Sequence, residues 1–118
     1  MKTFMKQEAF YALLDEGIRF PVRVLHAKGI DTGQSCQGGE GHAYDHPTID
    51  LIEGASQRDG FAALSALESY GLNVRDLSLL YNITDGLIIE NFWRITFRQA
   101  WPERAGEIPI FIWGYEAT

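Results

Sequence analysis

The chain lacks the features that mark several large classes of protein. Its 118 residues contain a single cysteine, so no internal disulfide can form, and a reducing cytoplasm is the expected compartment. No apolar run reaches the ~18 residues that a membrane-spanning helix needs. The N-terminal residues reach a glutamate too early to build the apolar core of a signal peptide. These absences predict a cytoplasmic protein with no membrane association.

Positive charge is also scarce. The sequence has 10 Lys and Arg against 16 Asp and Glu, a net charge of -6, and its cations form no cluster. Such a chain is a poor candidate for binding nucleic-acid backbones directly. By contrast, 46% of the residues are hydrophobic and 13% are aromatic, which excludes a disordered chain. The length fits one domain over residues 1–118.

Two amphipathic helices are predicted from periodicity and caps. Residues 3–16 place apolar side chains at three- and four-residue spacing, with Thr3 as the N-cap and Gly17 as the left-handed residue after the helix. A second helix begins at a capping box over residues 56–59 and ends at Gly71.

Strands are predicted where apolar residues alternate or where turn signals flank an apolar run. Phe20, Val22 and Val24 alternate, and Pro21 would place their strand at an edge of the sheet. Asp85-Gly86 is a strong hairpin signal. The predicted strands cover residues 20–26, 48–52, 74–84, 87–97 and 108–113. The resulting fold class is α+β: a single two-layer domain with two helices packed on a mainly antiparallel sheet of about four to five strands.

The stretch from residue 27 to residue 46 has neither a helical nor a strand period. Five glycines and several small polar residues fill it, which predicts a loop of about twenty residues. Structureless loops of that length are uncommon in compact domains and are often functional. The only cysteine and all three histidines fall within residues 26–46.

One interpretation of this loop is a metal centre. Cys36, His42 and His46 would supply three ligands to zinc, with Asp45 or Glu40 as a fourth ligand or a general base. However, the C-x5-H-x3-H spacing matches no standard zinc motif.

A second interpretation is a thiol hydrolase. Cys36 would be the nucleophile and His42 or His46 its base, with backbone amides of Gly38 and Gly39 holding an anion. Because no catalytic pattern is complete, non-enzymatic binding of a protein or a small ligand is the leading hypothesis, and an enzyme is the alternative. The predicted binding residues are Ser35, Cys36, Gln37, Gly38, Gly39, His42 and Tyr44.

The C-terminal quarter of the chain is rich in aromatic residues. These are Trp93, Trp101, Phe111, Trp113 and Tyr115. Core packing explains most of them, and any that remain exposed would form a surface for a partner or for a homodimer.

The segment from Ser35 to Thr48, SCQGGEGHAYDHPT, resembles a family of small bacteriophage and prophage proteins that has no established activity. The similarity continues through residues 60–65, Gly71-Leu72, Asp85-Gly86 and residues 93–97, and so covers about residues 33–98. The resemblance implies a phage or prophage origin and the cytoplasm of the bacterial host. The expected partner is then a host or phage protein.

Overall fold

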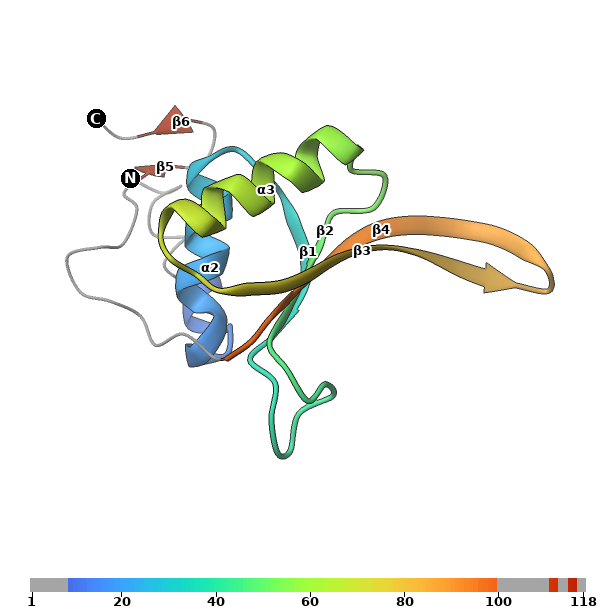
Figure 1. Cartoon of the computed structure of the whole chain (residues 1–118), viewed down its shortest axis with the longest axis horizontal. Helices are drawn as coiled ribbons and strands as arrows, with labels where there is room; N and C mark the ends of the chain where they lie inside the picture. Colours follow the sequence, from blue (N-terminus) through green and yellow to red (C-terminus); the bar gives the residue numbers. More distant parts are fainter. Residues whose placement is uncertain (1–8, 100–110, 113–114, 117–118) are drawn as a thin grey trace.

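A computed structural model describes residues 9–99, 111–112 and 115–116 of the chain. Residues 9–12 are helical, and two longer helices, α2 (Glu16–Ala27) and α3 (Gln57–Ser69), pack against an antiparallel sheet (Figure 1). The four strands of this sheet are, in order across it, β1 (Thr32–Cys36), β2 (Thr48–Leu51), β4 (Leu87–Phe97) and β3 (Val74–Thr84). The predicted α+β fold is confirmed.

The elements with strong local signals form as predicted. The capping box starts α3, because the Ser56 hydroxyl accepts from the Asp59 N–H at 3.1 Å and the Asp59 carboxylate accepts from the Ser56 N–H. Strands β3 and β4 meet at the expected turn, where Asp85 and Gly86 both have positive φ (51° and 79°). Two consecutive left-handed residues are what a two-residue hairpin turn requires.

The strand predicted at residues 20–26 is wrong, because this segment lies within helix α2. Gly17, expected to follow a helix, is buried in the first turn of α2. All residues of α2 except Glu16 and Arg19 are buried. Two patterns overlap in this segment: polar residues recur at helical spacing (Glu16, Arg19, Arg23 and His26), but Phe20, Val22 and Val24 also alternate as in a strand. Valines and Pro21, which lacks the N–H that would donate to Gly17, added to the impression of an edge strand.

The preceding predicted helix, residues 3–16, is shorter on its C-terminal side than expected. It has ended by Leu13, and Asp15 is already the N-cap of α2. Its predicted cap, Thr3, lies outside the described residues.

The long loop predicted at residues 27–46 is interrupted by strand β1. The strand is a short edge strand with an irregular register between Thr32 and Ser35, and its sequence has few of the residues that favour strands. The irregular connection that remains runs from Gln37 to Pro47 and is called the 37–47 loop below.

The predicted C-terminal strand lies partly outside the described residues. Phe111–Ile112 (β5) pairs with Tyr115–Glu116 (β6) in a separate two-stranded sheet, not with the main sheet.

The core lies between the two helices and one face of the sheet. Fully buried side chains from α2 and α3, including Phe20, Leu25 and Leu67, meet Ile49 and Ile95 from the central strands. The opposite face of the sheet carries polar residues. The 37–47 loop extends from the edge of the sheet where β1 ends and β2 begins (Figure 1). Among the described residues, no helix combines the length and the apolar character needed to cross a membrane.

The hairpin of β3 and β4 extends far beyond the rest of the sheet (Figure 1). Strand β2 pairs with β4 only from Asp50 to Thr48, opposite Arg94 to Thr96. Beyond that point the two long strands continue with only each other as sheet partners. Residues 79–93 of this hairpin are called the arm.

Candidate functional site

The 37–47 loop is fastened to the N-terminus of α2 by reciprocal hydrogen bonds. The Gly17 N–H of α2 donates to Gln37 Oε1 at 2.9 Å, and the Gln37 N–H donates to Asp15 Oδ2 at 3.1 Å. Asp15 occupies the N-cap position, yet its side chain makes no capping bond to its own helix. Gln37 therefore satisfies an N–H of α2, and the Asp15 carboxylate is turned toward the loop.

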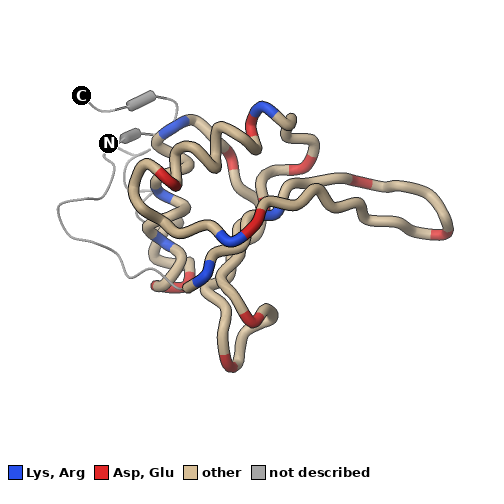
Figure 2. The backbone as a smooth tube through the Cα atoms, viewed as in Figure 1, with Lys and Arg blue, Asp and Glu red and all other residues tan. Residues whose placement is uncertain are grey.

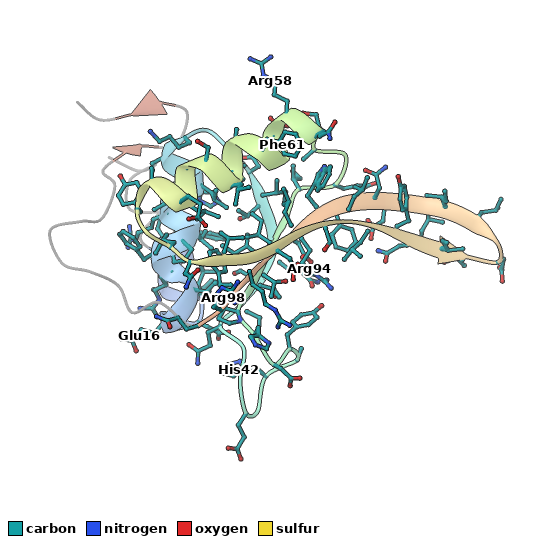
Figure 3. All side chains as sticks on the ribbon, viewed as in Figure 1. Glu16, His42, Arg58, Phe61, Arg94 and Arg98 are labelled. Carbon is teal, nitrogen blue, oxygen red and sulfur yellow. The ribbon has the colours of Figure 1, made fainter. Side chains whose placement is uncertain are left out.

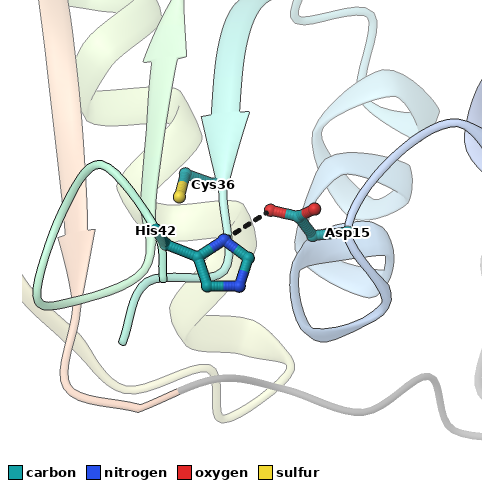
Figure 4. Close-up of side chains that lie close together, drawn as sticks. All are labelled: Asp15, Cys36 and His42. Atoms are coloured by element: carbon teal, nitrogen blue, oxygen red, sulfur yellow. Dashed lines mark ion pairs between the residues drawn. The ribbon is translucent and has the colours of Figure 1, made fainter. Parts of the chain in front are cut away.

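His42 completes this connection from the far side of the loop. Its Nδ1 lies 3.5 Å from Asp15 Oδ2 (Figure 4), and its Nε2 lies 3.1 Å from Gln37 Nε2. An amide nitrogen only donates, and the Gln37 amide is oriented by the Gly17 N–H that its oxygen accepts. His42 Nε2 must therefore accept, and the ring proton of neutral His42 sits on Nδ1, facing Asp15.

Cys36, at the end of β1, lies next to this pair. One donor atom each from Asp15, Cys36 and His42 falls within 4.8 Å of the other two, and all three side chains are half-buried (Figure 4). In tetrahedral zinc sites with bonds of 2.0–2.3 Å, ligand atoms are roughly 3.3–3.8 Å apart. The group is thus somewhat wide for a metal, and only small movements would close it.

The hydrogen bonds of His42 oppose metal binding at Nδ1. A metal there would displace the Nδ1 proton and leave it on Nε2, opposite the amide nitrogen of Gln37. Relieving that clash would require Gln37 to turn and abandon the Gly17 N–H. The three side chains could hold a metal only if the connection between the loop and α2 were rearranged.

The same bonds keep His42 from acting as a base for Cys36. Nδ1 of His42 faces Asp15 and Nε2 accepts from Gln37, so neither nitrogen is directed to take a proton from the thiol. The sulfur itself accepts from the Gly38 N–H at 3.4 Å. The nest expected from Gly38 and Gly39 is absent as well, because Gly39 N–H donates to carbonyls of the loop itself.

The other two histidines lie apart from the cluster. His46 has both ring nitrogens 3.2 Å from Nη1 of Arg75, so it does not join Cys36 and His42 as the sequence suggested. His26 is buried in α2 between the hydroxyls of Tyr11, at 2.8 Å, and Thr32, at 3.0 Å. Burial lowers the pKa of His26 to about 4, against a smaller upward effect of Asp31.

A hollow of about 370 Å³ opens beside the loop. Its walls are partly apolar, from Phe10, Leu14 and Ala43, and partly polar, from residues that include Cys36 and Tyr44. A second hollow of about 380 Å³ shares Gly33, Gln34, Tyr44 and Asp50 with the first and extends along the arm as far as Asn82 and Glu90. The two hollows adjoin on the polar face of the sheet.

Arg94 organises the boundary between the two hollows. Its guanidinium donates to both carboxylate oxygens of Asp50, at 2.7 and 3.1 Å, and to the Tyr44 hydroxyl at 3.0 Å. It also lies over the Tyr44 ring, 4.7 Å from the ring centroid. The hydrogen bonds to Asp50 raise the pKa of Arg94 above its usual value.

The predicted binding residues thus have three different positions. Ser35, Cys36 and Tyr44 line the first hollow. Gln37 and His42 fasten the loop to α2, and Gly38 and Gly39 shape its turn. The predicted binding set contains neither Asp15 nor Arg94. Asp15 is a residue type that favours the N-cap of a helix, and this is the sequence signal for its position. A strand predicted over residues 20–26 leaves no helix for Asp15 to cap.

No protein-family model matches this chain, and neither does any curated protein or any solved structure.

Proposed function

We propose that this protein works by binding, and that the hollow beside the 37–47 loop receives an apolar side chain of a protein partner. The single observation that carries the proposal is the hollow itself, about 370 Å³ in volume, lined by Ser35, Cys36 and Tyr44 of the predicted binding set. That volume lies within the range of ligand sites, and its apolar walls suit a leucine- or phenylalanine-sized group.

The polar groups around the hollow favour binding over catalysis. The Asp15 carboxylate accepts the Gln37 N–H, and Asp50 is neutralised by Arg94. These groups are occupied in holding the walls in place, and His42 is kept from acting as a base for Cys36. A partly apolar hollow with a polar rim is the arrangement that anchors side chains at protein interfaces.

The partner would be a host or phage protein in the bacterial cytoplasm, if the similarity of residues 33–98 to phage and prophage proteins reflects common origin. The net charge of -6 favours a partner surface with basic residues at its rim.

The experiment uses amide chemical shifts of the full chain with two probes, N-acetyl-leucinamide and N-acetyl-phenylalaninamide. Saturable shifts are expected at residues 33–36 and at Ala43 and Tyr44. Ala43→Trp, which adds an indole at the wall of the hollow, should abolish them. Glu40→Trp is the matched control, because Glu40 is exposed on the same loop and lines neither hollow.

The same two variants then test capture of a protein from host lysate. A partner that wild type and Glu40→Trp retain, but Ala43→Trp loses, supports the proposal. Probe shifts that are absent, or that Ala43→Trp leaves unchanged, would contradict it.

A second candidate is a metal-dependent or thiol hydrolase, which the proximity of Asp15, Cys36 and His42 favours. In that case Asp15 would replace the predicted ligand His46. The hydrogen bonds of His42 and Gln37 place this candidate second, and zinc content discriminates between the two, as argued in the Discussion.

A further inference from the structure

The apolar face of the sheet continues into the arm beyond the helices that cover it. On the core side, Leu77 of β3 pairs with Ile95 of β4, and Leu79 pairs with Trp93. Gly60 of α3 packs on the Trp93 ring. A Cβ added to Gly60 would lie only 3.3 Å from an atom of that ring. The first turn of α3 therefore reaches Trp93, which marks the boundary of the covered surface.

Beyond Trp93 the same face is mostly apolar, with Asn91 opposite Tyr81, and it becomes progressively exposed. The exposed fraction rises from 39% at Leu79 to 51% at Tyr81 and 63% at Ile83. Asn82 pairs with Glu90 and Ile83 with Ile88, so Ile89 is the extra residue of a bulge in β4. The bulge keeps Ile88, 62% exposed, on the same face as Ile83.

The area of this surface approaches what a stable interface needs. The exposed side chains on this face are those of Leu79, Tyr81, Ile83 and Ile88, with Ile89 at the bulge, whereas Leu87 pairs with Thr84 and so lies on the opposite face. Together they leave on the order of 500 Å² of apolar surface in contact with water, within the range for the largest patch on a monomer. Phe61 of α3, 54% exposed, lies toward the end of that helix that is nearer the arm (Figure 3). A standard interface buries about 800 Å² on each partner.

The two ends of this surface differ in charge, because the tip of the arm is acidic whereas α3 presents Arg58 beside its neighbour Asp59. The arm has no Lys or Arg, and its acidic residues are Asp85 at the tip and Glu90 (Figure 2). The only cation of α3 is Arg58, exposed in the first turn at the end nearer the arm (Figure 3). A second copy turned by 180° about an axis through the middle of the arm would bring each acidic tip toward the other copy's Arg58. A parallel arrangement would instead bring the two Asp85 tips together.

We propose that two copies of this chain dimerise through their arms, antiparallel and related by a twofold axis near Tyr81. The core-side face of each arm packs on that of the other, and the tip of each arm reaches Phe61 and Arg58 of the second copy. The interface is isologous, so the same apolar surface of each copy packs on that of the other. It does not involve the hollow beside the 37–47 loop.

Sedimentation velocity over a range of concentrations measures the association. The wild-type chain should reach twice its 13.3 kDa mass at micromolar concentration. Ile83→Asp/Ile88→Asp should remain monomeric, because both side chains are exposed and their loss leaves the core intact. Leu13→Asp, at an 86% exposed apolar residue outside the arm, is the control that should dimerise like wild type.

Charge neutralisation tests the antiparallel direction. Asp85→Asn retains a residue suited to the left-handed turn, and Arg58→Gln retains helix propensity. Each should weaken the dimer about threefold to fivefold, and the double variant should be no weaker than either single variant. Additive effects would contradict the proposed pairing of tip and helix.

Cross-linking tests the position of the axis. In a Cys36→Ala background, Tyr81→Cys should be cross-linked to a covalent dimer by a short bismaleimide, because a residue at a twofold axis faces its own copy and sheets that pack face to face lie about 10 Å apart, too far for a direct disulfide. Thr84→Cys, near the tip, should not. A wild-type chain that stays monomeric at 200 micromolar, or a dimer indifferent to Ile83→Asp/Ile88→Asp, would overturn the proposal. Binding of the arm to a different protein, with no self-association of the chain, would also overturn the proposal.

Discussion

Arg94 of β4 and Asp50 of β2 lie opposite each other in the sheet and form a two-pronged ion pair, with nitrogen–oxygen distances of 2.7 and 3.1 Å. Asp50 is only 8% exposed. Removing the guanidinium would leave a nearly buried carboxylate without its partner, a change that is costly even where the intact pair contributes little.

Arg94→Leu should therefore lower the free energy of unfolding by about 2–3 kcal/mol in urea denaturation, toward the lower end because Arg94 itself retains some contact with water. Arg98→Leu is the matched control: this arginine is exposed just beyond β4, and its loss should cost no more than about 0.5 kcal/mol (Figure 3). Equal losses in the two variants would show that the pair with Asp50 does not stabilise the fold. Adding Asp50→Asn to Arg94→Leu should recover part of the lost stability.

The sequence predicts those parts of this fold whose causes are local. The Asp85-Gly86 turn and the Ser56-Asp59 capping box depend on adjacent residues, and both form as expected. The strand prediction for α2 is wrong because two patterns overlap in its sequence. Phe20, Val22 and Val24 alternate as in a strand, while polar residues recur every three or four residues as in a helix, and the tertiary packing that buries nearly every side chain selects the helix.

The candidate site was predictable in part, for a similar reason. The loop that contains Cys36 and His42 stands out by composition alone. Its partner Asp15 lies more than twenty residues earlier, and only the packing of α2 against β1 brings the two together. Nor could the sequence show that the Gln37 amide fixes the tautomer of His42, since that depends on the Gly17 N–H.

Gly38 should be the least replaceable glycine of the 37–47 loop. A Cβ at this residue would lie 2.3 Å from the carbonyl carbon of His46 and 2.6 Å from the nitrogen of Pro47. Backbone atoms cannot move aside as a flexible side chain can, so the loop would have to open.

Gly39→Ala isolates this effect, because Gly39 has φ near +90° but open space around its missing Cβ. Both substitutions strain a left-handed residue, at a cost of about 1 kcal/mol. Gly38→Ala should cost at least about 2 kcal/mol more than Gly39→Ala in urea denaturation. It should also eliminate the probe shifts at Ala43 and Tyr44. Similar stabilities for the two variants would contradict the close approach of Gly38 to the backbone of His46 and Pro47.

His26 should make the protein less stable in acid. Desolvation lowers the pKa of this histidine from 6.5 to about 4, so between these values the unfolded chain binds a proton that the folded chain does not. The stability is fully present above pH 6.5 and is lost as the pH falls toward 4. Up to about 3 kcal/mol of unfolding free energy should disappear over this range.

Urea denaturation at several pH values, with His26→Gln beside wild type, measures the contribution. The variant will be less stable at pH 7.5, because Tyr11 and Thr32 lose the ring. The difference between wild type and variant should shrink as the pH falls from 6.5 to 4. His46→Gln, which leaves the buried ring in place, should follow the wild-type pH dependence. A wild-type curve parallel to that of His26→Gln would count against a depressed pKa.

Zinc content decides between the binding protein and the metal-dependent hydrolase. We expect protein purified without added metal to contain no stoichiometric zinc, and its Tm to be unchanged by EDTA. The reason is the proton on His42 Nδ1: a metal would have to displace it and would set Nε2–H against the donating amide of Gln37.

Gln37→Glu removes that conflict, because a carboxylate can accept both from Nε2–H and from the Gly17 N–H. This variant should therefore bind zinc more tightly than wild type in a competition titration with a chromophoric chelator. One zinc per wild-type chain, lost in Cys36→Ser and Asp15→Asn but retained in His46→Gln, would instead place a metal among Asp15, Cys36 and His42 and reverse the order of the two proposed functions.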